Sequence, residues 1–199
     1  MTPTHDAVSQ PTSKYSIWRS LKWWPSLAAI AFAAFVALDL FGGEEQGVDL
    51  APIVAASGLV YLAAAALKKP IAAWITFFAS VVIIIIAKLG VIDVDAAWLL
   101  LGLAAVLLLV GLVYAGVRPA SGLPLQTLAM LGFGAVAAVA LFLDARAGAY
   151  LVAAGLFAHA GWDAYHHRVN TVVGRSMAEF CFVLDVLLAA AIVIAAVRA

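Results

Sequence analysis

The sequence predicts an all-helical (all-α) protein: a polytopic transmembrane bundle of seven spans in one domain. Of its 199 residues, 66% are hydrophobic and only 11% are charged, about half the charged fraction of a soluble domain. The mean hydropathy is +1.11. The apolar residues form seven runs of about 20 residues, the length that crosses the hydrocarbon core of a bilayer.

The N-terminal segment, residues 1–21, is expected to be disordered or juxtamembrane, because MTPTHDAVSQPTSK is polar and offers no apolar core. The transmembrane domain then occupies 22–199. Its spans are expected at 22–41, 50–67, 71–90, 96–117, 123–143, 147–167 and 176–197. Short breaks containing Gly, Pro or charged residues separate them, so consecutive helices are expected to pack antiparallel as neighbours.

The distribution of charge predicts how the bundle is oriented. Basic residues collect in alternate loops: Lys14, Arg19, Lys22, Lys68, Lys69, Arg118, Arg168 and Arg175. The other loops and their flanks carry mostly acidic residues: Glu44, Glu45, Asp49, Asp93, Asp95 and Asp144, with Lys88, Arg146 and Arg198 as the basic exceptions. Because basic loops stay on the cytoplasmic side, the N-terminus is predicted to be cytoplasmic and the C-terminus outside.

The stretch HAGWDAYHH, residues 159–167, places several ionisable groups in the sixth predicted span. Each helical residue turns the side chain by about 100°, so His159, Asp163 and His166 lie within about 60° of one another, with His167 only slightly further round. Ionisable groups within a membrane are costly and usually functional. This face is therefore the first candidate site.

The seventh span adds two acidic residues, Glu179 and Asp185. It returns antiparallel to the sixth span, which brings Glu179 near the depth of Asp163 and Asp185 near that of His159. The two acids are about 120° apart on the helix, so only one is expected to face the sixth span. Asp185 is favoured, because it lies deeper and is costlier to leave without a partner.

Histidines beside carboxylates form a ligand set that suits a divalent metal ion such as zinc, iron or manganese. The candidate metal ligands are His159, Asp163, His166 and His167, and the candidate catalytic residues are Asp185 and Glu179. Such a metal could activate water against an ester or amide bond of a lipid. Polar residues on the second and third spans could complete the pocket: Ser57, Tyr61, Thr76 and Ser80.

Two resemblances accompany these residues. Seven spans with the N-terminus inside resemble the membrane hydrolase superfamily that includes alkaline ceramidases and adiponectin-type receptors, which would imply an intramembrane zinc and lipid amide hydrolysis. That family has a histidine pair four apart on its last helix, whereas the pair here is His159 and Asp163 on the sixth. The HAGWD spacing is also similar to a motif of bacterial carotene-cleaving dioxygenases, which use more histidines than the four in this chain.

Three functions are compatible with these patterns. The first is a metal-dependent enzyme, a hydrolase or oxidoreductase of a bacterial inner membrane, acting on a lipid or isoprenoid. The second is a small-solute or proton transporter or channel with a His/Asp relay, built on a three-helix repeat in which 50–67 aligns with 147–167. The third is a non-catalytic scaffold subunit.

The expected partners follow from the short loops and the balance of charge. Partners are limited to membrane lipids, a lipid-soluble or small substrate, another membrane protein or a second copy of the chain. Eleven basic and eleven acidic residues cancel, so net charge offers no argument for nucleic acid.

Overall fold

A computed structural model describes residues 21–43 and 46–198. The predicted disorder of residues 1–21 lies outside the described residues except for Leu21. The described part is all-helical, without strands, and has a helix at each of the seven predicted runs. These are α2 (Trp24–Gly42), α3 (Ala51–Leu67), α4 (Ile71–Lys88), α5 (Ala96–Tyr114), α6 (Leu123–Ala140), α7 (Ala145–Val169) and α8 (Arg175–Arg198), with the short 3-10 helices η1 (Leu21–Trp23) and η2 (Gly47–Leu50).

Local sequence signals set the ends of several helices. Asp95 and Asp144 are N-caps whose carboxylates accept hydrogen bonds from the first backbone amides of α5 and α7. Proline occupies the first turn of α2, α3 and α6, where its missing N–H leaves no helical bond unmade. Asn170 ends α7 in the left-handed conformation, with φ of 50°, which asparagine adopts more readily than most residues.

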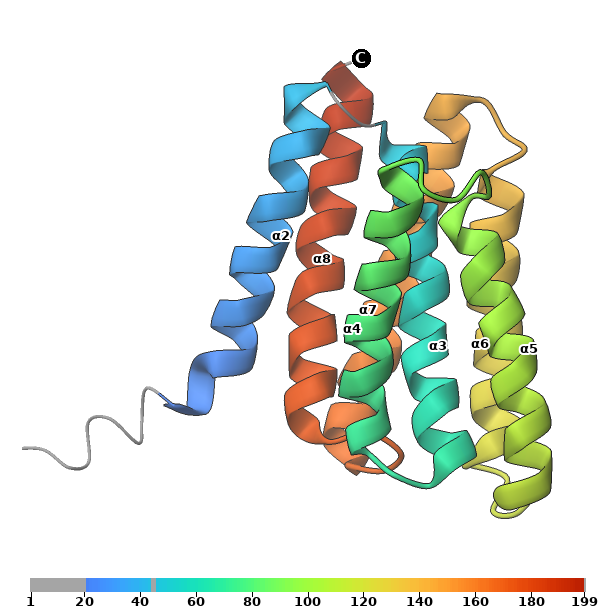
Figure 1. Cartoon of the computed structure of the whole chain (residues 1–199). Helices are drawn as coiled ribbons and strands as arrows, with labels where there is room; N and C mark the ends of the chain where they lie inside the picture. Colours follow the sequence, from blue (N-terminus) through green and yellow to red (C-terminus); the bar gives the residue numbers. More distant parts are fainter. Residues whose placement is uncertain (1–20, 44–45, 199) are drawn as a thin grey trace, which may run out of the picture.

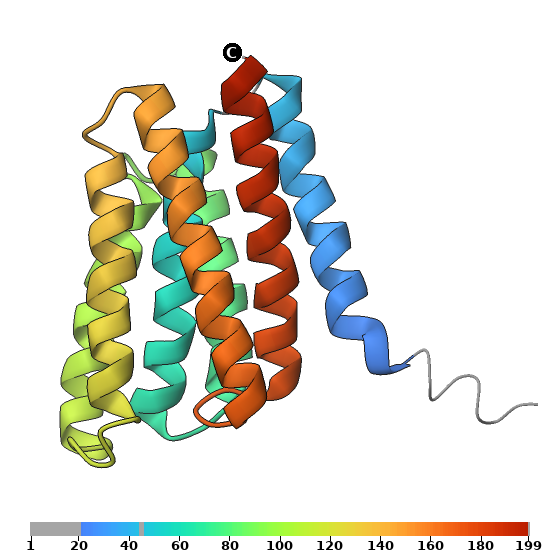
Figure 2. The ribbon, with the colours of Figure 1, turned by 180° about the vertical axis from the view of Figure 1, so that it is seen from behind.

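The helices run up and down, each antiparallel to the one before it (Figures 1 and 2). The α3–α4, α5–α6 and α7–α8 loops therefore gather at one end of the bundle, which we call the basic end. It is the lower end in Figure 1. The loops and helix ends there carry Lys68, Lys69, Arg118, Arg168 and Arg175. The opposite end holds the C-terminus and the other three loops.

α3 is the central helix of the bundle. It packs against α4, α5, α6 and α7, and 89% of the most apolar part of Gly47–Leu67 is buried. The first helix, α2, packs chiefly against the last, α8, rather than beside α3 as the short loop suggests. This difference arises because η2, which precedes α3, lies against α7 and α8.

Within the part of the chain that the structure describes, six helical segments are long and apolar enough to cross a membrane: α2, η2 with α3, α4, α5, α6 and α8. α7 is as long as these and lies in the same bundle, but it is less apolar because it carries the histidines and Asp163. Many large hydrophobic side chains point outward, among them Phe35, Phe78, Leu109 and Phe157. An apolar exterior on apolar helices of this length is typical of a protein whose solvent is lipid.

One glycine allows α7 to approach its neighbours closely just before the polar face. A Cβ atom at Gly155 would lie 2.7 Å from Val136 of α6 and 3.1 Å from Val54 of α3. Small residues at such contacts let membrane helices pack backbone to backbone. Gly155 is four residues, or about one turn, before His159, so this contact sets how deeply the histidine sits between the helices.

Candidate functional site

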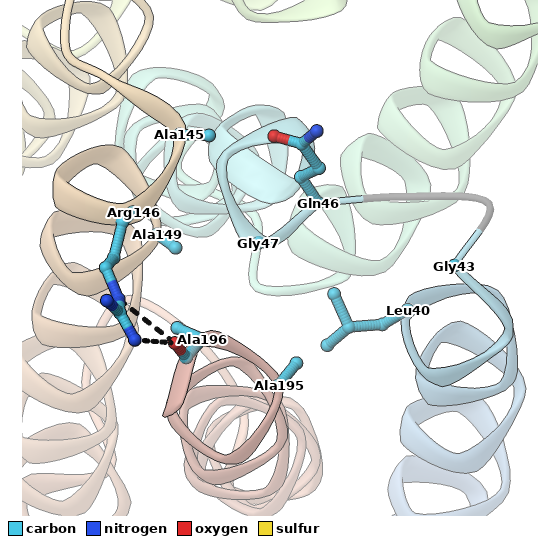
Figure 3. Close-up of a pocket in the computed structure, with 9 residues that line it drawn as sticks. All are labelled: Leu40, Gly43, Gln46, Gly47, Ala145, Arg146, Ala149, Ala195 and Ala196. Atoms are coloured by element: carbon cyan, nitrogen blue, oxygen red, sulfur yellow. Dashed lines mark hydrogen bonds between the residues drawn. The ribbon is translucent and has the colours of Figure 1, made fainter. Parts of the chain in front are cut away.

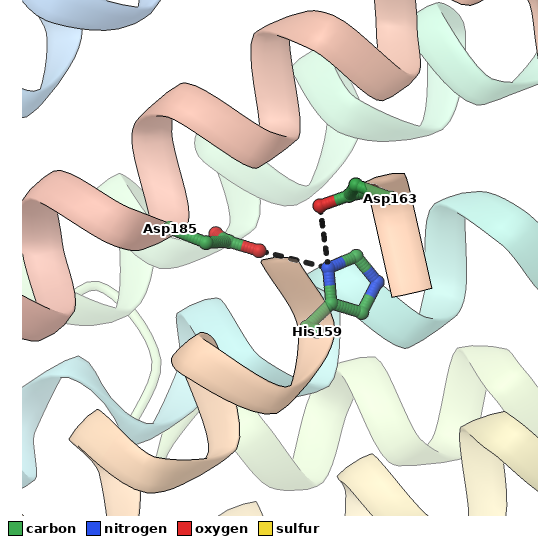
Figure 4. Close-up of side chains that lie close together, drawn as sticks. All are labelled: His159, Asp163 and Asp185. Atoms are coloured by element: carbon green, nitrogen blue, oxygen red, sulfur yellow. Dashed lines mark hydrogen bonds and ion pairs between the residues drawn. The ribbon is translucent and has the colours of Figure 1, made fainter. Parts of the chain in front are cut away.

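The predicted polar face of α7 meets α8 inside the bundle (Figure 4). His159 and Asp163 lie one turn apart on α7, and Asp185 of α8 faces them. The Nδ1 atom of His159 is 2.8 Å from Oδ2 of Asp185 and 3.2 Å from Oδ2 of Asp163. The three side chains are 0–1% exposed. We call these three residues the His/Asp group.

The group forms because α7 and α8 pack closely along their length after the short loop 170–174. The antiparallel return puts His159 and Asp185 at matching depths, as the sequence predicts. Only one acid of α8 belongs to the group: Asp185 does, while Glu179 lies on another face of the helix. Glu179 accepts a hydrogen bond of 2.5 Å from the hydroxyl of Ser26 on α2, so it points away from the His/Asp group.

Tyr61 of the central helix completes the immediate surroundings. Its hydroxyl donates a hydrogen bond of 2.6 Å to Oδ1 of Asp163, and its ring stands edge-on to His159, with centroids 5.4 Å apart. On α6, the Phe133 ring also stands edge-on to the His159 imidazole, with centroids 4.8 Å apart. Asp163 is therefore fixed by Tyr61, and His159 is held between aromatic rings.

Two atoms of the group have no hydrogen-bond partner although both are buried: Nε2 of His159 and Oδ2 of Asp163. The single proton of Nδ1 explains the second. In the tautomer that carries the proton on Nδ1, this proton goes to the nearer Asp185, so Asp163 at 3.2 Å receives none. In the other tautomer, Nδ1 is free to bind a metal ion. Buried polar atoms are almost always satisfied, and each orphan raises the question of what else binds there. Of the two, Oδ2 of Asp163 lies beside Nδ1 and could accept a ligand together with it, whereas Nε2 lies on the other side of the imidazole ring (Figure 4).

The spacing of the donor atoms suits a metal ion. One ligand atom from each of His159, Asp163 and Asp185 lies within 4.8 Å of the other two. A four-coordinate ion with bonds of about 2.0–2.1 Å places its ligand atoms about 3.3 Å apart. Nδ1 of His159 lies at a similar distance from the two carboxylate oxygens, 2.8 and 3.2 Å. Two carboxylates with a neutral imidazole would also balance the charge of a divalent ion, which matters where no water screens it.

The second histidine of the predicted face, His166, is buried but belongs to a neighbouring cluster. Its Nδ1 donates to the Trp162 carbonyl at 3.0 Å, and its Nε2 lies 3.1 Å from Nε2 of Gln126 on α6. The amide nitrogen can only donate, so His166 accepts there. Both imidazole nitrogens are engaged, and the ring packs edge-on to Tyr61 at 4.8 Å. His166 therefore supports the site from beside it.

The remaining predicted ligand, His167, is half-buried near the end of α7 and lies outside the His/Asp group.

Gln126 of α6 is a further buried polar residue, and it is not among the predicted site residues. It is fully buried, and its Oε1 atom has no hydrogen-bond partner among the described residues. The signal was present in the sequence, since Gln126 stands in the otherwise apolar start of a span, LPLQTLAML. A polar residue in such a run needs a partner.

None of the three side chains of the His/Asp group lines any of the cavities described below. One of about 440 Å³ opens at the end opposite the basic end, between α2, α7 and α8 (Figure 3). Arg146 spans its side and donates from Nε and Nη2 to the carbonyl of Ala196 at 3.2 and 3.0 Å. This arginine thereby satisfies a carbonyl at the end of α8, where a cation is also favoured by the helix dipole. A structural role accounts for it.

Comparison of the chain with models of known protein families, with curated proteins and with solved structures finds no match. The structure and its chemistry therefore carry the functional argument. They describe a helical protein with helices of membrane-spanning length and a buried His/Asp group that could hold a metal ion.

Proposed function

We propose that the protein is a seven-span membrane protein that binds one divalent metal ion, zinc, iron or manganese, through His159, Asp163 and Asp185. We further propose that it uses the ion as a metal-dependent enzyme acting on a lipid or isoprenoid. The observation that carries the proposal is the convergence of three donor atoms within 4.8 Å at 0–1% exposure. Buried ionisable groups of this kind in membrane proteins generally mark function.

The seven-span arrangement follows if α7 crosses the membrane with the helices that flank it. α6 and α8 are both of spanning length, and α7 connects them inside the same bundle. Its polar residues within the bundle, His159, Asp163 and His166, are buried against α3, α6 and α8 rather than facing lipid, which removes most of the penalty of carrying them. With basic residues retained inside, the basic end is cytoplasmic, the C-terminus is outside, and a bacterial inner membrane is the proposed location.

In this proposal the ion supplies a Lewis acid and an activated water, while the protein supplies position. His159 and the two aspartates hold the ion, and Tyr61 fixes the orientation of Asp163 through its 2.6 Å hydrogen bond. Such partners of metal ligands tune both affinity and geometry. Because the group is buried, a substrate reaches it only when the surrounding helices separate.

Elemental analysis of protein purified without chelator tests the proposal. The wild type should carry about one equivalent of metal, and His159→Ala and Asp185→Ala should lose it, since three ligands are the usual minimum for a tight site. His167→Ala is the matched control, because it removes a histidine from the same helix outside the group. Background metal in a well-folded wild type would overturn the metal proposal.

A proton relay is the second candidate, favoured by one further observation. Hydrogen bonds link Asp185 to His159 and Tyr61 to Asp163, with His159 and Asp163 3.2 Å apart. His166 and Gln126 continue this polar series toward the basic end. Proton flux into liposomes that falls in Asp185→Asn, with no bound metal, would favour the relay. A loss of stability with neither metal nor flux would indicate a structural clamp, as a scaffold subunit requires.

A further inference from the structure

We propose that the basic end of the bundle contains a binding site for an anionic phospholipid, with the headgroup in a cationic cavity and one acyl chain between α5 and α6. The inference rests on the membrane placement proposed above and is independent of the metal. It starts from a cavity of about 440 Å³ lined by residues of α3, the α3–α4 and α5–α6 loops, the start of α6 and the α7–α8 loop. We call it the cationic cavity.

Two cations from different loops line this cavity, Lys68 and Arg118. Both are exposed, and neither forms an ion pair within residues 21–43 and 46–198. Five other residues make a largely apolar wall: Ala64, Ala65, Pro70, Leu123 and Val172. Two unpaired cations over an apolar wall complement a phosphate group attached to an apolar body, because Arg and Lys are the side chains that recognise phosphate.

The start of α6 adds to the positive potential. Gly122 and Leu123 line the cavity, and no side chain caps this helix start. The dipole of a helix start favours an anion placed there. The backbone itself offers few donors, since Pro124 has no N–H and the Leu125 N–H already donates to the Ala120 carbonyl. The helix start therefore reinforces the two side chains, which by themselves define the charge of the cavity.

A second, apolar groove lies deeper between the same pair of helices. Its volume is about 390 Å³, and its lining comes from α5 and α6 with Leu62 of α3 beneath. The groove exists because small residues face it, including Ala104, Ala105, Gly134 and Ala135. Thr127 adds no polarity, since its hydroxyl donates to the carbonyl of Leu123. We call it the α5–α6 groove.

The relative position of the two features identifies the occupant. Both are lined by residues of α3 and of the α5–α6 pair with its loop, with the cationic cavity at the basic end and the apolar groove toward the middle of the bundle. Leu123, which packs near Gly111 and Ala66, separates them on the inner side. A charged feature at the membrane boundary followed by an apolar groove matches the charge pattern of a phospholipid. A soluble phosphate compound would leave the groove unused.

Native mass spectrometry of the purified protein, mixed with equal amounts of phosphatidylglycerol and phosphatidylcholine, tests this site. The wild type should retain phosphatidylglycerol preferentially, by about tenfold. Lys68→Gln with Arg118→Gln should abolish the preference. Lys69→Gln is the matched control, because Lys69 is the adjacent lysine but does not line the cavity, and it should keep the preference.

The groove has its own pair of variants. Ala105→Leu with Ala135→Leu fills it from both helices at exposed positions and should lower retention of both lipids. Gly132→Leu adds the same side chain to α6 where nothing lies within 4 Å, outside the groove, and should not. Equal retention of the two lipids by the wild type would overturn the proposal. So would complete displacement of phosphatidylglycerol by an equal concentration of inorganic phosphate, which would indicate a soluble anion.

The metal content of the same samples separates this site from the His/Asp group. His159→Ala should keep the preference for phosphatidylglycerol, while the Lys68 and Arg118 variant should keep its metal. Melting temperatures identify any variant that fails to fold, and in that case the groove variants decide the result. Failure of the metal proposal thus leaves the lipid preference intact, and failure of the lipid proposal leaves the metal content intact.

Discussion

Two polar centres in this bundle use the same chemistry in opposite surroundings. At the end opposite the basic end, Lys88 of α4 pairs with Asp39 of α2 at 2.6 Å, with side chains 47% and 37% exposed. In the core, His159 lies between Asp163 and Asp185 at 0–1% exposure. Exposed pairs contribute about 0–1 kcal/mol, whereas breaking a buried one costs about 3–5 kcal/mol. Burial of the charged side chains is therefore what separates the candidate site from the surface contact.

The sharpest test of this contrast removes one member of the buried group. Asp185→Ala leaves His159 without its closest partner and should lower the free energy of unfolding by about 3–5 kcal/mol. Reversible unfolding in detergent or lipid measures the change. Glu179→Gln is the control on the same helix, since Glu179 bonds Ser26 outside the group. A loss below about 1 kcal/mol for Asp185→Ala would place the group with the exposed pair.

A smaller change tests whether Tyr61 is part of the buried centre. Tyr61→Phe keeps the ring and removes only the hydroxyl that donates to Asp163. A buried acceptor left unsatisfied lowers stability by about 1–3 kcal/mol, and the ligand Asp163 loses its orientation. The free energy of unfolding and the metal affinity should therefore both fall. The same unfolding assay measures the first, and metal titration measures the second. Unchanged metal affinity would separate Tyr61 from the site.

Packing around the buried centre can be tested without changing any polar group. Gly155→Ala introduces a Cβ atom 2.7 Å from Val136 and should destabilise the protein by about 1–3 kcal/mol through overpacking. Gly161→Ala, on the same helix, meets nothing within 4 Å and should be neutral or slightly stabilising. Thermal melting of the two variants compares them. Equal melting temperatures would mean that α7 does not depend on this close approach.

The exposed pair should give the smallest effect. Asp39→Asn removes its charge and leaves a side chain of the same shape, so the expected loss is about 0.2–1 kcal/mol. It should also shrink further in salt, because exposed charges are screened. Unfolding at low and high ionic strength measures both. A loss as large as that of Asp185→Ala would remove the distinction between the two centres.

The helices were predictable because each is an apolar run ended by Gly, Pro or charged residues, as at Lys68 and Pro70. The pairing of His159 with Asp185 was also predictable, because matched depth follows from the rise per residue along two antiparallel helices. Which helices pack against each other was harder to predict from the sequence. The contact of α2 with α8 depends on where η2 packs, and loop length does not encode that.

The division of the histidines could not be read from helix geometry alone. His159 and His166 share a face of α7, yet the first meets Asp185 and the second meets Gln126. The difference lies in α6 and α8, whose rotation about their own axes depends on side-chain packing along their whole length. Angles within one helix predict which residues lie together on its surface. They do not predict which neighbour each one meets.

The central position of α3 has a consequence for how the chain is made. In the membrane placement proposed above, protein synthesis delivers helices from the N-terminus onward, so α3 is inserted before every helix that follows it in the chain. All four helices that it packs against, α4, α5, α6 and α7, arrive later. Until then Tyr61 has neither Asp163 nor the two histidine rings beside it. The central helix is thus exposed to lipid until these helices are in place. It is suited to this exposure because its surface is alanine-rich and its Ser57 hydroxyl donates to the Ile53 carbonyl of the same helix.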